Sequence, residues 1–283
     1  MDIVTWNIQC GKGCDGIVDL RRIVETACAL APADVLCFQE VAVNFPELDG
    51  GSGEDQVAVL AALLPGYQAI FRPGVDRPGT ETGDRRFGNA LFSRLPVLQV
   101  LAHLLPRPAE AGGRSMQRLA LEVVVDAPFG PLRIVTTHLE YHSVAHRAAQ
   151  VEFLRDVHRE AAMRARLKDA PDRSQGPYRS IARPAAAVLC GDFNFEPADP
   201  LHARIQAPFE GDVPAFLDAW TFLHPKLPHP PTCGIADFAQ WPSGPHCRDF
   251  AFVTAEIASR ARRIAVDGKT TASDHQPLLL TLA

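Results

Sequence analysis

Apolar residues recur along the chain in two spacings, one typical of strands and one typical of helices. The first apolar run, residues 2–7, fits a strand, and apolar positions over residues 17–28 recur at helical spacing. The next run, residues 35–39, fits a short buried strand. A strand, helix and strand of this length usually leave the two strands parallel, so we expect Asn7 and Glu40 at the same sheet edge.

Strand-like runs dominate the middle of the chain, after a second predicted helix at residues 54–64. Some follow each other directly, which indicates antiparallel neighbours joined by hairpins. A long helical segment covers residues 142–167, and strand-like runs continue beyond it. The predicted strands after the second helix are residues 67–71, 88–93, 97–105, 117–125, 132–137, 185–190, 250–254 and 277–282.

Two stretches rich in Pro, Gly and Arg, residues 72–86 and 168–184, have the composition of interdomain linkers. We interpret both as loops, because polar motifs lie on both sides of each and one site is not easily built from several independent domains. The sequence therefore predicts a single domain over residues 1–283. Its pattern favours an α+β fold with two packed mixed sheets and helices outside.

Composition limits the location and the partners of the protein. The formal net charge is -5 and the sequence pI is about 6.1, so no overall basic field favours non-specific nucleic-acid binding. The first residues show no basic segment followed by an apolar core, and no apolar run reaches the roughly 18 residues of a membrane span. We expect a cytoplasmic protein without a membrane span, and a monomer as the default oligomeric state.

Short polar clusters follow or begin several predicted strands, where side chains leave a sheet edge. They offer carboxylates, amides and imidazoles, without a clustered Cys and His set. Carboxylate and amide oxygens suit Mg²⁺ better than zinc, and Mg²⁺ suits phosphoryl chemistry. The clusters are Thr5-Trp6-Asn7, Gln39-Glu40, Thr137-His138-Leu139, Gly191-Asp192-Phe193-Asn194, Arg248-Asp249-Phe250 and Ser273-Asp274-His275.

In their order along the chain, five of these clusters, all except Arg248-Asp249-Phe250, resemble motifs of the endonuclease/exonuclease/phosphatase superfamily, which has the deoxyribonuclease I-like fold. The run Gly88–Arg94 resembles the central strand motif of the same superfamily. One tripeptide is weak evidence, but six motifs in the family's order, each at a strand end, are specific. The resemblance implies a four-layer α/β/β/α sandwich with two mixed, mostly antiparallel sheets face to face. It also implies hydrolysis of a phosphate ester by in-line attack of water.

The resemblance implies a role for each matched carboxylate and amide. Glu40 resembles the principal metal ligand, with Asn7 and Asp274 near the ion directly or through water. Asp192 resembles the carboxylate that orients or deprotonates the attacking water, helped by Asn194. Mg²⁺ is the expected cofactor, with Mn²⁺ as a substitute. The resemblance leaves open whether one or two ions bind and which residue takes the proton of the water.

The imidazoles take the remaining roles that the resemblance implies. His275 contacts the scissile phosphate and is a candidate general acid, with its ring held by Asp249. His138 stabilises charge on the phosphate oxygens. His138, His142 and His146 are also four residues apart, but His138 ends a predicted strand, so helical spacing cannot join all three into a zinc site.

Four further residues are candidate substrate contacts: Asn89, Arg85, Arg86 and Arg147. Residues 155–183 carry more basic than acidic side chains, which fits either a nucleic-acid contact or a solvated helix face. Trp241 is a candidate for stacking on a base or an apolar group of the substrate.

Several candidates also have a purely structural interpretation. Asp192 and Asn194 fit an Asx turn after a strand, Asn7 fits a turn residue, and Glu40 fits the start of a helix. Arg147 fits helix-surface packing equally well.

The sequence favours a Mg²⁺-dependent phosphodiesterase or nuclease that acts on a phosphate-ester substrate, with nucleic acid slightly preferred. A phosphatase or phosphodiesterase of a small molecule or lipid head group is the alternative, motivated by the acidic pI. A catalytically silent binding module is the third hypothesis. It is disfavoured because an idle cleft has no physical need for clustered like charges.

Overall fold

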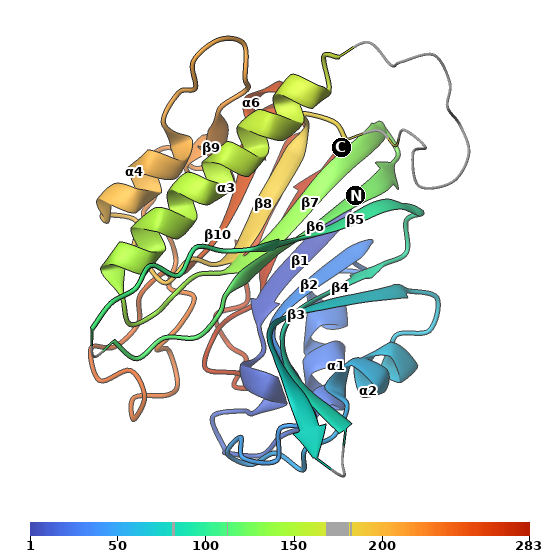
Figure 1. The fold of residues 1–283 in the computed structure, drawn as a ribbon, viewed down its shortest axis with the longest axis vertical. Helices are drawn as coiled ribbons and strands as arrows, with labels where there is room; N and C mark the ends of the chain where they lie inside the picture. Colours follow the sequence, from blue (N-terminus) through green and yellow to red (C-terminus); the bar gives the residue numbers. More distant parts are fainter. Residues whose placement is uncertain (81–82, 112, 168–180, 182) are drawn as a thin grey trace.

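The computed structural model describes residues 1–80, 83–111, 113–167, 181 and 183–283, in which five strands follow one another between α2 and α3 (Figure 1). The strands are β1 (Asp2–Asn7), β2 (Val35–Val43), β3 (Gln68–Thr80), β4 (Gly83–Ser93), β5 (Val97–Leu104), β6 (Leu119–Ala127), β7 (Gly130–His138), β8 (Ala187–Asp192), β9 (Phe216–Asp218), β10 (Asp249–Thr254), β11 (Ala261–Val266) and β12 (Leu278–Leu282). The helices are η1 (Gln9–Gly11), α1 (Leu20–Leu30), α2 (Gln56–Leu63), α3 (Val144–Arg164), α4 (Pro200–Gln206), α5 (Ala219–Leu223) and α6 (Ala255–Ala258).

The described strands form two mixed sheets of six strands each. The first has the order β11-β12-β1-β2-β4-β3, and the second has the order β5-β6-β7-β8-β10-β9. The pairs β1–β2 and β7–β8 are parallel, and the other ladders are antiparallel. Both sheets are therefore mostly antiparallel, as predicted.

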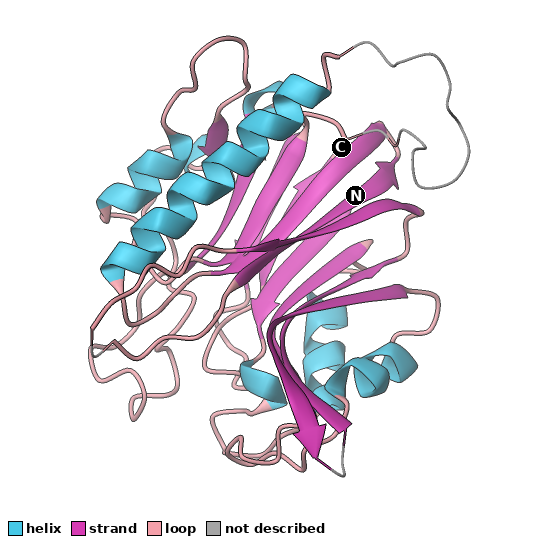
Figure 2. Cartoon of the chain, in the orientation of Figure 1, coloured by secondary structure: helices cyan, strands magenta, loops and turns pink. Residues whose placement is uncertain are grey.

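The two sheets pack face to face, and helices cover their outer faces. Ile3 and Leu91 of the first sheet share one buried core with Val123 and Ile134 of the second. Figure 2 shows α1 and α2 against one outer face and the long α3 with α4 against the other. This arrangement is the predicted four-layer α/β/β/α sandwich. The single domain over residues 1–283 remains a prediction, which this shared core supports.

β1 is a continuous apolar run in the sequence because both of its faces are buried. Ile3 belongs to the core between the sheets, whereas Val4 and Trp6 belong to the core under α1 and α2. The predicted parallel pairing of β1 with β2 is confirmed, and Asn7 lies opposite Gln39 in its register. The two strands consequently deliver their last polar residues to the same sheet edge.

The prediction of a loop over residues 72–86 is wrong for residues 72–80 and 83–86, which belong to the antiparallel pair of β3 and β4; residues 81–82 lie outside the described residues. Pro73 and Pro78 are tolerated because β3 is the edge strand of its sheet, where a missing N–H leaves no central ladder broken. The register shifts beside both prolines. An edge strand that contains prolines thus has the composition of a loop.

Other predicted elements are found within a few residues of their expected ends. The segment 142–167 contains α3, whose first turn is capped by Ser143. The predicted loop 168–184 lies outside the described residues, apart from 181, 183 and 184. No helix in the described part of the chain has both the length and the apolar character needed to cross a bilayer.

Gly191, directly before Asp192, has a φ of 135°, and an added Cβ would lie 2.0 Å from the carbonyl oxygen of Thr137. Gly191→Ala is therefore expected to lower the free energy of unfolding by about 3 kcal/mol or more, measured by urea denaturation. Gly130→Ala is the matched control, because its φ is 109° but no atom lies within 4 Å of the added Cβ. Gly130→Ala should lower the free energy of unfolding by only about 1 kcal/mol. Equal losses in both variants would refute the steric explanation.

Candidate active site

Strand ends from both sheets converge on one polar cluster. β1 supplies Asn7, β2 supplies Glu40, β8 ends at Asp192, and the loop before β12 supplies Asp274 and His275. The cluster gains His138 and Asp249 because both pair with Asp192 in the registers of β7 and β10. The structure thus gathers residues separated by more than two hundred positions along the chain.

Asn7 is the link between the two sheets. Its Nδ2 donates to Glu40 Oε1 and to Asp192 Oδ2, both at 3.0 Å. Its Oδ1 accepts a hydrogen bond from the backbone N–H of Gln9, which fixes the orientation of the amide. The amide nitrogen of Asn7 therefore holds the carboxylates of Glu40 and Asp192 next to each other.

Glu40 lies at an irregularity of the β2–β4 ladder and has a φ of 60°. This left-handed conformation interrupts the pairing of β2 and re-aims the side chain, as a β-bulge does. Burial, followed by the negative charge of Asp274, raises the pKa of Glu40, while Asn7 acts in the opposite direction. The helix-start interpretation of Glu40 is wrong, because the residue lies inside a strand.

His275 is held between two carboxylates. Its Nδ1 lies 2.8 Å from Asp249 Oδ2, and its Nε2 lies 3.7 Å from Asp192 Oδ2. Burial opposes a charge on the ring, but Asp249, Asp192 and Asp274 together raise the pKa of His275 well above its usual value. Burial raises the pKa of Asp249 to about 6 against the influence of His275. The imidazolium of His275 is therefore the favoured form at neutral pH.

The pKa of His138 is shifted in the opposite direction to that of His275. Its Nε2 lies 3.4 Å from Asp192 Oδ2 and its Nδ1 lies 3.9 Å from Glu40 Oε1. Burial and then the positive charge of Arg118 lower the pKa of His138 to about 3. The ring is uncharged at neutral pH and can act there only through a neutral N–H or a lone pair.

Asp192 is ionised at neutral pH. Burial opposes its charge, but the imidazoles of His138 and His275, with the hydrogen bond from Asn7, lower the pKa of Asp192. Because His138 is uncharged at neutral pH, His275 and Asn7 carry this effect there. Asp192 Oδ1 also accepts from the backbone N–H of Asn194 at 2.9 Å, so the predicted Asx turn is present beside the site contacts.

Asp274 lies beside the cluster in a hydrogen-bonded frame. Its Oδ2 accepts from Gln240 Nε2 at 2.7 Å and from Trp241 Nε1 at 3.0 Å. Ser273 Oγ lies 3.3 Å from Asp274 Oδ1 and donates to the carbonyl oxygen of Asn7. Trp241 is buried, and its indole N–H is bound to this carboxylate. Its ring therefore packs within the wall of the site.

The donor set around Glu40 fits a hard divalent cation. Glu40 has no ion pair with a Lys or Arg among the described residues, although Asp274 and Asp192 add negative charge nearby. About a quarter of its side-chain surface is exposed, so an ion can reach the carboxylate. Carboxylate and amide oxygens are the ligands that Mg²⁺ prefers. The carboxylates of Glu40 and Asp274 are therefore suited to hold it, whereas Asn7, also expected near the ion, turns its NH2 group to Glu40 and its oxygen to the N–H of Gln9.

The four candidate substrate contacts are differently placed. Asn89 is buried and donates to the carbonyl oxygens of Leu119 and Thr136, so its amide serves to join the two sheets. Arg147 donates to two backbone carbonyls near the start of α3, but it also lines a cavity beside the site.

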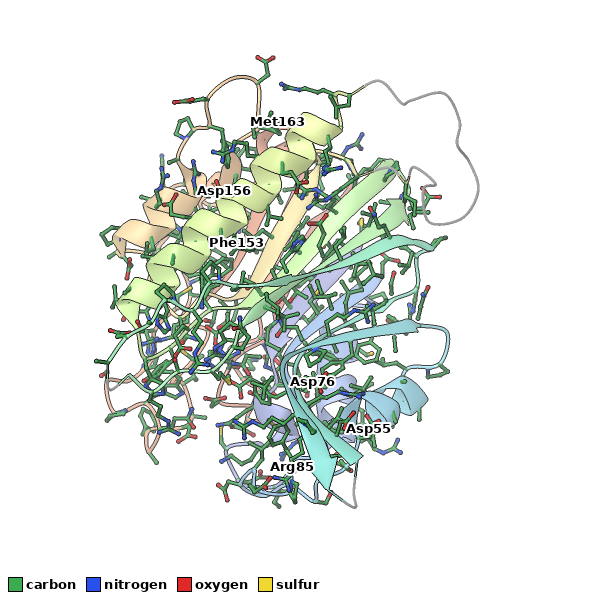
Figure 3. The ribbon with its side chains drawn as sticks, in the orientation of Figure 1. Asp55, Asp76, Arg85, Phe153, Asp156 and Met163 are labelled. Atoms are coloured by element: carbon green, nitrogen blue, oxygen red, sulfur yellow. The ribbon has the colours of Figure 1, made fainter. Side chains whose placement is uncertain are left out.

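Arg85 and Arg86 lie on the outer part of the β3–β4 hairpin, where Figure 3 labels Arg85. Arg85 pairs with Glu47, and Arg86 pairs with Asp76 and Asp84. Neither arginine contacts a residue of the cluster in the described part of the chain. Their charges are offset by local acids.

The basic stretch of residues 155–183 is also largely neutralised where it is described. Arg164 pairs with Glu160, and Arg183 is buried against Glu122. Arg155 donates to backbone carbonyls at the end of α4. Three of its basic residues lie outside the described residues: Lys168, Arg173 and Arg179. The described part therefore resembles a solvated helix face more than a phosphate-binding surface.

Sequence reasoning missed several polar neighbours of the cluster. Arg118, at the edge of β6, lies 3.5 Å from Glu140 and contributes positive charge toward Glu40 and Asp192. Gln240 contacts Asp274 from a loop without strand or helix character. In the sequence, Arg118 is an arginine directly before an apolar run, and this position alone does not point to the site.

The four-layer fold and the cluster at its sheet edges agree with a family model. The Endonuclease/Exonuclease/phosphatase family model matches residues 4–275, so the chain belongs to this family. The family resemblance predicted from the sequence is thereby confirmed. No curated protein matches the chain.

Solved structures share the fold over the full length of the chain. An endonuclease/exonuclease/phosphatase from Beutenbergia cavernae has 22% identity and a TM-score of 0.67, covering 100% of this chain and 72% of that one. A Neisseria 3′ phosphatase bound to a product DNA hairpin has 18% identity and a TM-score of 0.62, covering 100% and 99%. A mannosyl-6-phosphatase from Bacteroides thetaiotaomicron has 15% identity and a TM-score of 0.64, covering 100% and 99%. Such identities show the fold alone.

Proposed function

We propose that this protein hydrolyses phosphodiesters with the help of Mg²⁺, for which Mn²⁺ can substitute. One observation carries the proposal: Asn7 holds Glu40 and Asp192 together at 3.0 Å each, beside the His275–Asp249 pair. A cation site, a basic carboxylate and an acidic imidazole thus lie within one cluster. The family membership and the phosphatase names of two relatives with the same fold support this class of reaction.

Asp192 is the proposed base. Its lowered pKa keeps it ionised, and its Oδ2 faces the cluster beside the two imidazoles. A carboxylate in this position can orient an attacking water and take its proton, while the backbone N–H of Asn194 fixes the other oxygen. In-line attack then places the leaving group on the opposite side of the phosphorus.

His275 is the proposed acid and phosphate contact. Its raised pKa supplies an imidazolium, and Asp249 at Nδ1 leaves Nε2 as the nitrogen directed toward Asp192 and the cluster. The Nε2 proton can stabilise charge on the phosphate or pass to the leaving oxygen. His138, which stays neutral, can donate only a hydrogen bond. When bound, Mg²⁺ supplies charge neutralisation at the phosphate oxygens.

A small phosphate ester is the second candidate substrate, in place of an extended nucleic acid. A cavity of about 540 Å³ opens beside Asn194, which is the size of a small-molecule site. In the described part of residues 155–183, Arg164 and Arg183 are paired with acids, which disfavours that part as a surface for tracking a polymer. These two observations favour a compact substrate, or the end of a strand, over the middle of a long duplex.

Hydrolysis assays with defined esters test the proposal. We expect turnover of bis(p-nitrophenyl) phosphate with Mg²⁺ or Mn²⁺ and loss of turnover with EDTA. Plasmid nicking and a panel of small phosphate monoesters, run beside it, separate a nuclease from a small-molecule enzyme. If none of the esters is hydrolysed and calorimetry detects no Mg²⁺ binding, the enzyme hypothesis is rejected in favour of a catalytically silent binding module.

A further inference from the structure

The cavity beside Asn194 has a wall that the proposed chemistry does not use. Its lining includes Tyr141, Arg147, Arg248 and Asp199. Asn194 belongs both to this lining and to the Asx turn of Asp192. A group bound in the cavity would therefore lie directly next to the proposed reaction centre.

Arg248 is held in place without a carboxylate. Its guanidinium carbon lies 5.0 Å from the ring centre of Trp241 and 5.4 Å from that of Tyr141. Its Nε donates to His246 Nε2 at 2.7 Å, and its Nη1 lies 3.4 Å from Asn194 Oδ1. Two aromatic rings and a histidine thus fix a cation in one position.

The charge of Arg248 is not offset within the described residues. It makes no ion pair there, and its Nη2 has no hydrogen-bond partner among them. The other lining arginine, Arg147, is already bound to the carbonyl oxygens of Glu140 and Tyr141. Arg248 is therefore the cation of this wall that is available for a ligand.

Tyr141 adds a second feature. It is 43% exposed, and its ring lies 6.0 Å from that of Trp241 in an edge-to-face arrangement. A half-exposed aromatic ring beside a fixed guanidinium suits a ligand that has a flat group and an anion. The carboxylates of Asp199 and of the exposed Glu196 can accept hydrogen bonds from hydroxyl or amino groups of the same ligand.

We propose that Arg248 and Tyr141 form a subsite for a second phosphate and its attached flat group, so that the substrate is a nucleotide-like ester with an anion next to the scissile phosphate. The inference rests on the proposed hydrolytic function and specifies its substrate class. A guanidinium and a phosphate form charge-assisted hydrogen bonds, and such bonds change affinity by about 10- to 100-fold.

Two matched esters test the subsite: p-nitrophenyl thymidine 5′-phosphate and the same compound with an added 3′-phosphate. In the wild type with Mg²⁺, the 3′-phosphate should lower KM by about 10- to 100-fold. Arg248→Gln should make the two KM values nearly equal, and Arg248→Lys should retain part of the preference. The ratio of the two esters within one variant cancels any effect of Arg248 on Asn194.

Arg260→Gln is the matched control, because Arg260 also lies over an aromatic ring, 4.5 Å from the centre of Phe129, but outside the site. It should keep the full preference. No preference in the wild type, or a preference that persists in Arg248→Gln, would overturn the proposal. Circular dichroism confirms that each variant is folded.

Failure of the proposed function is separable from failure of the subsite. If the wild type hydrolyses neither ester, calorimetry with thymidine 3′,5′-bisphosphate and thymidine 5′-phosphate measures the subsite without turnover. Tighter binding of the bisphosphate that is lost in Arg248→Gln would uphold the subsite. Equal binding of both nucleotides by the wild type would reject it.

Discussion

His275→Ala is expected to lower the turnover of phosphate esters by about 10²–10⁴-fold, the usual contribution of a positioned acid or base. The variant removes the imidazolium that Asp249 and Asp192 hold in its charged form. It also removes two buried charge contacts, so circular dichroism and thermal melting must accompany the measurement of kcat.

His224→Ala is the control for this experiment, because His224 packs on Trp220 away from the cluster. It should leave kcat unchanged. Near-wild-type turnover of a folded His275→Ala protein would remove His275 from the mechanism. Asp249→Asn would then be expected to have no effect either, because its proposed role is to hold the ring of His275.

Glu40→Gln is expected to abolish the binding of Mg²⁺ and, with it, metal-dependent turnover. The substitution keeps the shape of the side chain and removes the charge that a hard cation needs. Since burial and Asp274 raise the pKa of Glu40, its carboxylate is held at a cost in the metal-free protein. The metal-free variant should therefore be at least as stable as the metal-free wild type.

Thermal melting with and without Mg²⁺ measures this effect. A ligand that binds only the native state raises the melting temperature, so Mg²⁺ should stabilise the wild type and leave Glu40→Gln unchanged. Glu47→Gln is the matched control, because Glu47 is an exposed partner of Arg85 on the hairpin side of the molecule. If Mg²⁺ still raises the melting temperature of Glu40→Gln, the ion is bound by residues other than Glu40.

Both experiments probe contacts that no segment of the chain contains by itself. Asn7 and Asp192 lie 185 positions apart and meet because β1 and β8 occupy the middle of opposing sheets. Gln39 shows the same dependence, since its amide donates to Thr5 in its own sheet and to Thr136 in the other. Packing of the two sheets is therefore what completes the cluster.

The arginines near the motifs show that a local sequence pattern cannot tell which cation is free for a ligand. Arg85, Arg86 and Arg248 are all basic residues near motifs, and the sequence cannot rank them. The structure pairs the first two with acids on the hairpin and leaves Arg248 without an ion pair among the described residues. Whether a cation is free for a substrate depends on its spatial neighbours, which only folding supplies.

The sequence by itself determined the strands and helices with clear periodicity, the parallel β1–β2 pair and the family. These follow from local spacing and from short motifs at strand ends, which residues can express without long-range contacts. Only the tertiary structure decided the edge position that makes residues 72–80 and 83–86 strand, the opposite pKa shifts of His138 and His275, and the fixed position of the Arg248 cation. Each of these depends on burial and on charges brought close from distant parts of the chain, because electrostatic and packing energies are set by distance in space.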